Sequence, residues 1–456
     1  MSARVTNHWR TVALACALVV ALAQPGPAKL SAPPWGQFQG GPTHAGSATG
    51  PEPPYETAWT YRAGEGLSGP VFDGDALYAV GSDAVHAVSM VDGTEQWMVP
   101  RSGPVSMPAI NIALEGQALL YTDGEKDNTE LVALDTTSRK RVWSVPLEDD
   151  SKSGVTVDGE SAFVGNDSGQ LFSFFVSSGK QAWSTDLGDG EIDSPPVVAE
   201  GLVIAGMQNP STGAFKLVAV NEEDGGREWS YNPVATGFPS ALTFANGKVV
   251  AGYTDRNVRA INAESGTVSW SSLVRFFGSL AVSPAASGDA VYVTDVSGGL
   301  YRLDDRSGMR EWDFQFNWKV PSGGGLAQRG SPIVAGDYVV IGLQDGRLAA
   351  VDAETGELAW EQETGDGALK SIAVAGDTLV VGKGGDDGGL VAFRHDPDGQ
   401  LTHIPSPTTL DLGGVLVAFA IGFLIVFAVV LGVGLLIKWR LPPEEVVDLV
   451  EAEEEE

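Results

Sequence analysis

The sequence predicts an all-β fold, an eight-bladed β-propeller of four-stranded antiparallel blades, followed by one C-terminal transmembrane α-helix. Three observations predict it: a tryptophan that recurs at intervals of 38 to 48 residues, a turn glycine that recurs eight times, and a run of 26 residues without a charge. A four-stranded unit that repeats with a period of about 43 residues is typical of a propeller blade.

One repeat can be followed between residues 330 and 360. Runs rich in β-branched and aromatic residues occupy 331–334, 338–341, 348–351 and 357–360, and turn residues with glycine or aspartate separate them. This alternation predicts four strands joined by hairpin turns. So small a sheet leaves both faces exposed unless copies of itself cover them, which explains the repetition.

The copies carry two markers. The tryptophan of the fourth strand recurs, after Trp59, at Trp97, Trp143, Trp183, Trp229, Trp270, Trp312 and Trp360. Glycine stands four residues before each of these seven except Trp143, where Arg139 stands. The glycine of the first turn recurs at Gly74, Gly116, Gly159, Gly201, Gly247, Gly288, Gly336 and Gly376. We expect the glycines to permit a positive φ and the tryptophans to fill the wedge between blades, a structural and not a catalytic role.

The N-terminus predicts export. Residues 1–23 combine Arg4 and Arg10 with a largely apolar run of 13 residues and an A-x-A site, the pattern of a signal peptide. The only cysteine, Cys16, lies inside this segment, and a lipid anchor on it is disfavoured because the apolar run continues beyond it. The mature chain then has no cysteine for a disulfide, a thiolate nucleophile or a metal site.

The start of the mature chain predicts how the ring closes. Residues 24–54 are rich in Pro and Gly and predict an extended lead-in, while residues 55–404 form the predicted propeller. The strand around Trp59 has no earlier strands of its own blade, and the last blade lacks a clear fourth strand. We therefore expect the Trp59 strand to complete the last blade; the alternative is that residues 400–404 supply that strand.

The C-terminal region predicts a membrane anchor. Residues 405–411 form a short linker, and the uncharged residues 412–437 predict a single transmembrane helix. Lys438 and Arg440 follow it directly, so we expect the tail, residues 438–456, in the cytoplasm and the propeller on the extracytoplasmic side of the cell membrane. The acidic tail is expected to be solvated; the alternative is a docking peptide for a basic cytosolic partner.

The chain is strongly acidic. It has 28 Lys and Arg against 59 Asp and Glu, a formal net charge of −31. Phosphate binding needs a basic surface, so this balance argues against a nucleic-acid partner, and it disfavours adsorption to anionic lipid. It fits either a high-salt habitat or a cation-rich wall.

The segment from Trp35 to Gly40, followed by His44-Ala45-Gly46, resembles the Trp-x-x-Phe-x-Gly opening of the pyrroloquinoline-quinone-like repeat propellers, and residues 348–360 are similar to that family's repeat. The resemblance implies eight blades and two kinds of member. The quinoprotein alcohol dehydrogenases bind a quinone and calcium and use a catalytic aspartate. Non-catalytic members include the scaffold subunit of the Gram-negative outer-membrane protein assembly machine. This chain is short, has no cysteine pair and shows no matching Glu, Asn and Asp set, so it resembles the second kind, although its C-terminal helix differs from that scaffold's lipid anchor.

The residues do not predict catalysis or a metal site. The five histidines do not fall at metal-ligand spacing, and no G-x-S-x-G elbow is present. Residues 123–128 faintly resemble a calcium loop but lack its glycine and its bidentate acid, so a hairpin tip is the better interpretation. We expect no cofactor; pyrroloquinoline quinone and calcium have no recognisable site.

A binding surface is the remaining question. In a propeller, the connections between blades share one face with the turns between second and third strands. The long connection 313–330, the connection before it and two further lysines give a candidate binding face for a peptide or an anionic wall ligand: Arg275, Phe276, Phe277, Trp318, Lys319, Arg329, Lys152 and Lys370. The alternative is that Phe314 and Phe316 continue the outer strand by alternation and that the bases balance nearby acids.

These observations together predict a non-catalytic binding or scaffold module at the cell envelope, anchored in the membrane, with an envelope protein or peptide as partner. One alternative is a quinone-dependent oxidoreductase. Another is a receptor-like sensor that acts through a partner, since 19 cytoplasmic residues carry no output domain.

Overall fold

The structure is a computed structural model that describes residues 35–102, 112–125, 128–151, 153–233, 240–253, 255–274, 283–295, 298–316, 330–365, 367–384 and 388–401. Within these ranges, no helix is long and apolar enough to cross a membrane. The predicted signal peptide, linker, transmembrane helix and acidic tail all lie outside them.

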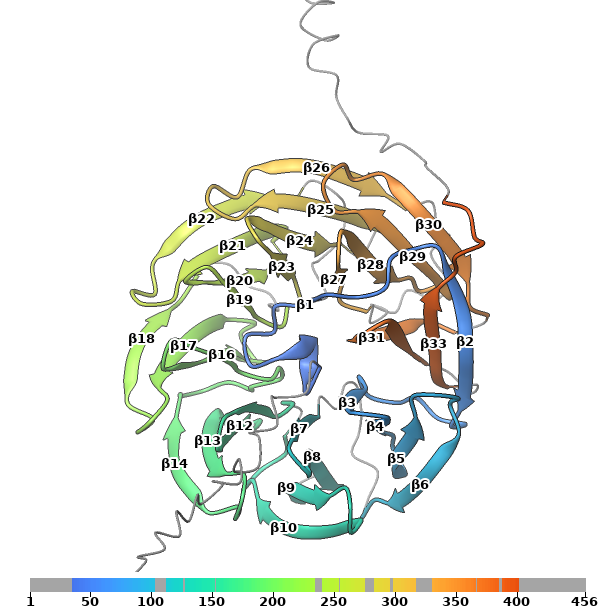
Figure 1. The fold of residues 1–456 in the computed structure, drawn as a ribbon. Coiled ribbons are helices and arrows are strands. Elements are labelled where there is room, and N and C mark those ends of the chain that lie inside the picture. The colour runs from blue at the N-terminus through green and yellow to red at the C-terminus, as the bar shows by residue number, and fades with distance from the viewer. Residues whose placement is uncertain are drawn as a thin grey trace, which may run out of the picture.

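Eight antiparallel sheets surround a central axis and form the predicted propeller (Figure 1). Blade 1 consists of β3 (Val71–Asp73), β4 (Ala76–Val80), β5 (Ala84–Ser89) and β6 (Glu95–Pro100), and blade 2 of β7 (Ala113–Glu115), β8 (Ala118–Glu125), β9 (Asn128–Asp135) and β10 (Lys140–Pro146). Blade 3 consists of β11 (Thr156–Asp158), β12 (Ser161–Gly165), β13 (Gln170–Phe175) and β14 (Gln181–Asp186), and blade 4 of β15 (Val197–Ala199), β16 (Leu202–Gln208), β17 (Phe215–Asn221) and β18 (Arg227–Tyr231).

Blades 5 to 8 follow the same order from the axis outward. Blade 5 consists of β19 (Thr243–Ala245), β20 (Lys248–Gly252), β21 (Asn257–Asn262) and β22 (Val268–Leu273), and blade 6 of β23 (Ala285–Ser287), β24 (Ala290–Thr294), β25 (Gly299–Asp304) and β26 (Arg310–Gln315). Blade 7 consists of β27 (Ile333–Ala335), β28 (Tyr338–Gly342), β29 (Arg347–Asp352) and β30 (Leu358–Glu363), and blade 8 of β31 (Leu369–Ala375), β32 (Thr378–Lys383), β33 (Gly389–His395) and β2 (Tyr55–Arg62).

The ring closes through the N-terminal strand, the first of the two alternatives. β2 pairs antiparallel with β33, with Trp59 opposite Ala392, and is the outer strand of blade 8. Residues about 340 positions apart thus form one sheet, and no blade is left with an incomplete edge.

Each repeated tryptophan sits beside a β-bulge. In all eight blades, the pairing of the third and fourth strands shifts by one residue directly before the tryptophan. A bulge bends and twists a strand, which re-aims the side chains next to it. The tryptophans are buried or half-buried, with exposed fractions of 6–9% for six of them.

The tryptophan of one blade contacts the next blade in a recurring way. For Trp59, Trp143, Trp183, Trp229, Trp270 and Trp312, the indole nitrogen donates a hydrogen bond to a carbonyl of the following blade, at 2.6–3.2 Å. In that following blade, the glycine four residues before its own tryptophan lies against the indole ring. At Gly308, for example, a Cβ atom would be 2.5 Å from Cε3 of Trp270. At these six junctions, each blade is therefore joined to the next by both an apolar contact and a hydrogen bond.

Two tryptophans are covered differently. Arg139 occupies the glycine position opposite Trp97, adopts a positive φ of 60°, and places its guanidinium 6.0 Å from the indole ring. This arrangement is a cation–π contact. Trp360 faces blade 8, whose outer strand comes from the N-terminus, and the ring of Tyr55 packs edge-on against it at 4.9 Å. Arg139, which stands where the other repeats have glycine, thus covers its tryptophan through a cation–π contact instead.

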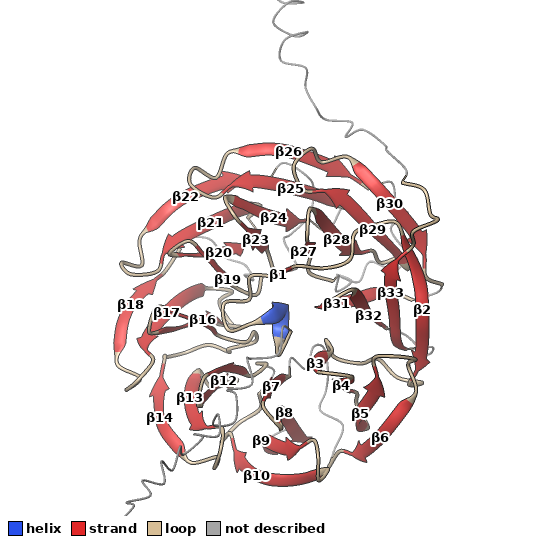
Figure 2. Cartoon of the chain, viewed as in Figure 1, coloured by secondary structure: helices blue, strands red, loops and turns tan. Residues whose placement is uncertain are grey.

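The lead-in is part of the ring. Residues 35–48, here called the N-terminal clasp, cross the middle of the propeller as η1 (Phe38–Gly40) and β1 (Ser47–Ala48), and β1 pairs in parallel with β27 (Figures 1 and 2). The backbone N–H at the middle of each innermost strand of blades 1 to 7 donates to an oxygen of this clasp. The donors, in blade order, are Phe72, Leu114, Val157, Val198, Phe244, Ala286 and Val334, and the acceptors are Trp35, Gly36, the Gln37 side chain, Pro42, Thr43, Ala45 and Gly46.

This arrangement follows from what the innermost strands lack. Each has a free edge toward the axis, and a buried backbone N–H without an acceptor destabilises the fold. The clasp supplies one oxygen to each of seven blades, and the Gln37 amide also donates back to the Val157 carbonyl at 2.8 Å. The sequence predicted an extended segment here but not its place inside the ring, because backbone oxygens carry no side-chain pattern.

His44 is the buried titratable group of the clasp. Its Nε2 lies 3.2 Å from the Thr156 hydroxyl, and its backbone has a positive φ of 50°. Burial lowers the pKa of His44 to about 3, and a backbone hydrogen bond at Leu242 opposes the shift only in part. The imidazole is therefore neutral in the folded protein at neutral pH.

Replacing Gly308 with alanine is expected to destabilise the ring more than replacing Gly288. Both residues have a positive φ, of 71° and 58°, but a Cβ at Gly288 has no neighbour within 4 Å. The backbone strain costs about 1–2 kcal/mol in either variant, and the clash with Trp270 adds about 1–3 kcal/mol only at Gly308. Denaturant unfolding of the two variants measures the difference. An equal loss of stability would contradict the packing role assigned to the glycine.

His44 is expected to make the fold less stable in acid. The unfolded chain takes up a proton near pH 6.5, whereas the folded chain does so only near pH 3, so stability falls as the pH decreases between these values. His44→Asn removes the titration with a residue that tolerates a positive φ. Between pH 7 and pH 4, the wild type should lose about 3 kcal/mol more than this variant. The exposed His395→Asn is the control, and parallel pH profiles for wild type and His44→Asn would disprove the assignment.

Candidate functional site

The structure describes only one residue of the candidate binding face. Lys370 lies exposed in β31, at the end of blade 8 where the connection from blade 7 arrives. The other seven lie outside the described residues: Arg275, Phe276, Phe277, Trp318, Lys319, Arg329 and Lys152. Phe314 and Phe316, which begin the same long connection, are buried between blades 6 and 7 with their rings 4.8 Å apart, so alternation along the outer strand accounts for them.

Lys370 lies at the end of its blade where the second and third strands are joined, and a position that the sequence analysis missed organises this end of most blades. The residue four places after the repeated tryptophan donates its N–H to the loop between the second and third strands of its own blade; this holds for Leu147, Leu187, Val274 and Phe316. Their side chains are buried in the cores that join each blade to the next. We call this the plug position. Arg101 and Thr364 occupy it in blades 1 and 7.

At the junction of blades 1 and 2, the plug is a buried arginine. Arg101 pairs with Asp123 of β8 at 3.2 Å, and both side chains are fully buried. The guanidinium also donates to the carbonyls of Gly81 and Thr122, and Arg141 forms a second ion pair with Asp123. A buried carboxylate needs such partners to remain charged. Asp123 is thus committed to a structural network, and the segment that faintly resembles a calcium loop is the β8–β9 hairpin.

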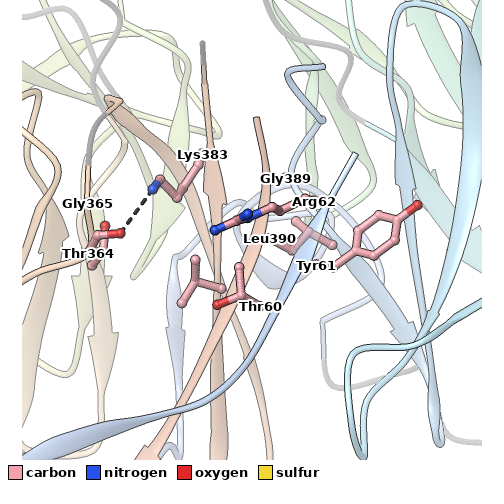
Figure 3. Close-up of a pocket in the computed structure, with 9 residues that line it drawn as sticks. Thr60, Tyr61, Arg62, Thr364, Gly365, Lys383, Gly389 and Leu390 are labelled. Atoms are coloured by element: carbon pink, nitrogen blue, oxygen red, sulfur yellow. Dashed lines mark hydrogen bonds between the residues drawn. The ribbon is translucent and has the colours of Figure 1, made fainter. Parts of the chain in front are cut away.

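At the junction of blades 7 and 8, the plug is too small to fill its space. Thr364 is only half-buried, and its hydroxyl donates to the Gly346 carbonyl at 2.8 Å. A cleft of about 230 Å³ lies beside it, lined by β2, β32 and β33. Figure 3 shows Arg62 and Lys383 extending toward the Thr364 side of this cleft, whereas Tyr61 points the opposite way.

Lys383 occupies a position that recurs in other blades. It stands seven residues after the first-turn glycine, as do Asp123 in blade 2 and Asn166 in blade 3. Its ammonium donates to the Thr364 carbonyl at 3.0 Å, just as the Asn166 amide donates to the Leu147 carbonyl at 2.9 Å. The junctions therefore share the same backbone arrangement. They differ in the side chains at two positions, the plug position and the position equivalent to Lys383.

The seam between blades 8 and 1 holds a chain of polar side chains. His86 is buried and lies between the Tyr61 hydroxyl, at 2.9 Å from Nδ1, and the Glu65 carboxylate, at 3.1 Å from Nε2. Tyr61 in turn donates to Glu95 at 2.6 Å. Burial opposes ionisation of Glu65, but hydrogen bonds from Ser82, His86 and the Asp83 backbone outweigh it and lower the pKa of the carboxyl group. Both ring nitrogens of His86 are thus hydrogen-bonded to side chains at the seam.

One group of three carboxylates lies close together among the described residues. Asp167, Glu191 and Asp193 approach within 4.8 Å of one another at the junction of blades 3 and 4. All three take part in further interactions, so they do not form an open ligand set.

The comparisons with known proteins agree with this geometry. A family model described as outer membrane protein assembly factor BamB, of the pyrroloquinoline-quinone-like repeats, matches residues 127–275 and 214–378, together more than half of the chain. The chain belongs to this family. BamB of Burkholderia pseudomallei is 28% identical over 297 residues, which cover 61% of this chain and 72% of that protein.

Solved structures show the same fold. BamB from Moraxella catarrhalis has a TM-score of 0.57 at 16% identity and covers 75% of this chain and 100% of that one. A quinohemoprotein alcohol dehydrogenase from Pseudomonas putida HK5 has a TM-score of 0.66 at 14% identity and covers 82% of each chain. At these identities the likeness concerns the propeller alone.

Breaking the ion pair of the first junction is expected to cost more than replacing it. Asp123→Asn leaves Arg101 buried without a full counter-charge, which costs about 3–5 kcal/mol. The double variant Arg101→Leu with Asp123→Asn reproduces the Leu147 and Asn166 pair of the next junction and should lie within about 1.5 kcal/mol of the wild type. Unfolding free energies of both variants test this, and a double variant as unstable as the single one would refute the equivalence of the junctions.

Proposed function

We propose that this BamB-family chain is a non-catalytic scaffold of the cell envelope, whose propeller binds a protein or peptide partner. The single observation that carries the proposal is the family match over residues 127–378, because the curated relative is named as an assembly factor. The polar groups at the described junctions support it, since Arg101 with Asp123 and His86 with Glu65 are paired with each other.

We further propose that residues 412–437 anchor the propeller in the cell membrane, with residues 438–456 in the cytoplasm. The support is the sequence: 26 residues without a charge, followed by Lys438 and Arg440. A single anchor of this kind holds a binding module close to the membrane.

The candidate binding face is the proposed site of partner contact. Replacing Arg275, Phe277 and Trp318 together with alanine is expected to lower recovery of crosslinked envelope proteins at least fivefold, because interface energy concentrates in aromatic and arginine side chains. The matched control replaces Arg306, Met309 and Val91, which are exposed on turns at the opposite ends of the strands. Unchanged recovery from the first variant would remove this face from the proposal.

Quinone-dependent oxidation is the competing function, because the quinoprotein dehydrogenases share the fold. Pyrroloquinoline quinone and calcium are titrated into the full chain, with dye-linked alcohol oxidation as the readout. The scaffold function predicts neither saturable binding nor oxidation. Saturable binding together with oxidation would replace it.

A further inference from the structure

The cleft between blades 7 and 8 exists because the plug position carries a threonine. At four other junctions this position holds a buried apolar side chain, Leu147, Leu187, Val274 or Phe316, within the core that joins the two blades. Thr364 is smaller than leucine and directs its hydroxyl to its own blade, onto the Gly346 carbonyl. The space that a leucine fills elsewhere is left as the cleft of about 230 Å³.

Two cations face this space without a carboxylate partner. Lys383 donates only to the Thr364 carbonyl, and neither Lys383 nor Arg62 forms an ion pair with any residue that the structure describes. Other basic residues near junctions, such as Lys248 and Arg347, do pair with acids.

At the junction of blades 1 and 2, the same two positions carry side chains of opposite charge. There the plug is Arg101, and the position equivalent to Lys383 is Asp123, so the chain supplies both cation and anion. Between blades 7 and 8, the described residues that line the cleft supply cations and space but no carboxylate. The missing group is therefore a carboxylate or a group that resembles one.

We propose that the cleft beside Thr364 binds a carboxylate of a partner peptide between Arg62 and Lys383. The guanidinium fork matches a carboxylate geometrically, and the ammonium of Lys383 has donors left after its bond to Thr364. The cleft of about 230 Å³ has room for a carboxylate carried on a side chain or a chain terminus. This names a ligand class for the proposed binding role and rests on it.

The net charge of the protein sets the conditions of the test. An acidic peptide is repelled at long range by a chain of charge −31, and the local attraction acts only inside the cleft. At 0.15 M salt, the repulsion is screened beyond about 8 Å, whereas contacts within the cleft persist. Titrations are therefore run on the full chain at that salt concentration.

Three probes separate the sources of the carboxylate. The first is a pentaglycine blocked at both ends with glutamate at its centre, the second carries glutamine there, and the third is pentaglycine with a free carboxyl terminus. Calorimetric titration is expected to show saturable binding of the first, the third or both, and none of the second. Whichever binds identifies an acidic side chain or a chain terminus as the ligand.

Matched variants locate the binding. Arg62→Gln with Lys383→Gln should weaken binding at least tenfold, because it removes the charge-assisted hydrogen bonds. Lys180→Gln, at an exposed turn of blade 3 and outside the residues that line the cleft, should change it less than twofold. Thr364→Leu should abolish binding by filling the cleft, with the unfolding temperature within a few degrees of the wild type. Asp386→Asn with Asp387→Asn, which flank the cleft residues in sequence, should leave binding unchanged or tighter.

The proposal is overturned if the glutamine peptide binds as well as the glutamate peptide. It is also overturned if Arg62→Gln with Lys383→Gln binds like the wild type, or if the Asp386 and Asp387 variant loses binding. These titrations use no partner protein, so they fail independently of the crosslinking test of the scaffold function.

Discussion

Eight four-stranded sheets can cover both of their faces only if the ring they form is closed. Closure depends on two neighbouring segments from one end of the chain. β2 completes blade 8, and the clasp of residues 35–48 hydrogen-bonds to the innermost strands of blades 1 to 7. The seam between blades 8 and 1 is then fixed by the Glu65, His86 and Tyr61 chain. The tryptophan packing and the plug positions then join neighbouring blades locally.

The regular part of the fold could be predicted from the sequence because it depends on residues that recur. The tryptophan and first-turn glycine periods indicate eight blades, and the missing strands at both ends indicate how blade 8 is completed. The clasp could not be predicted in the same way. Its contacts use main-chain oxygens and one glutamine, and the carbonyl of any residue accepts equally well. The Trp-x-x-Phe-x-Gly motif that begins it pointed to a family and not to a position in the ring.

The candidate site was only partly predictable for a different reason. The search for exposed basic and aromatic residues selected the longest connections, most of which lie outside the described residues. The cleft at Thr364 involves no unusual residue, only an ordinary threonine where four other blades have a larger, buried apolar side chain. It becomes visible when residues are counted from the repeated tryptophan and from the turn glycine, because those two registers place Thr364 and Lys383 in one junction. Arg62 cannot be added by counting, since its strand belongs to the last blade only through closure.

The clasp also has a consequence for how the protein is made. Residues 35–62 are synthesised before every other strand of the ring, yet their partners extend to His395, at the C-terminal end of the propeller sequence. The entropy lost in closing so long a loop grows only slowly with its length, so distance alone is no obstacle. The order of synthesis matters more: a segment that touches every blade cannot reach its final position until the last blade has been made. The intermediate blades expose their inner edges during that interval, so the growing chain is a row of unfinished sheets that residues 35–62 convert, at the end, into a ring.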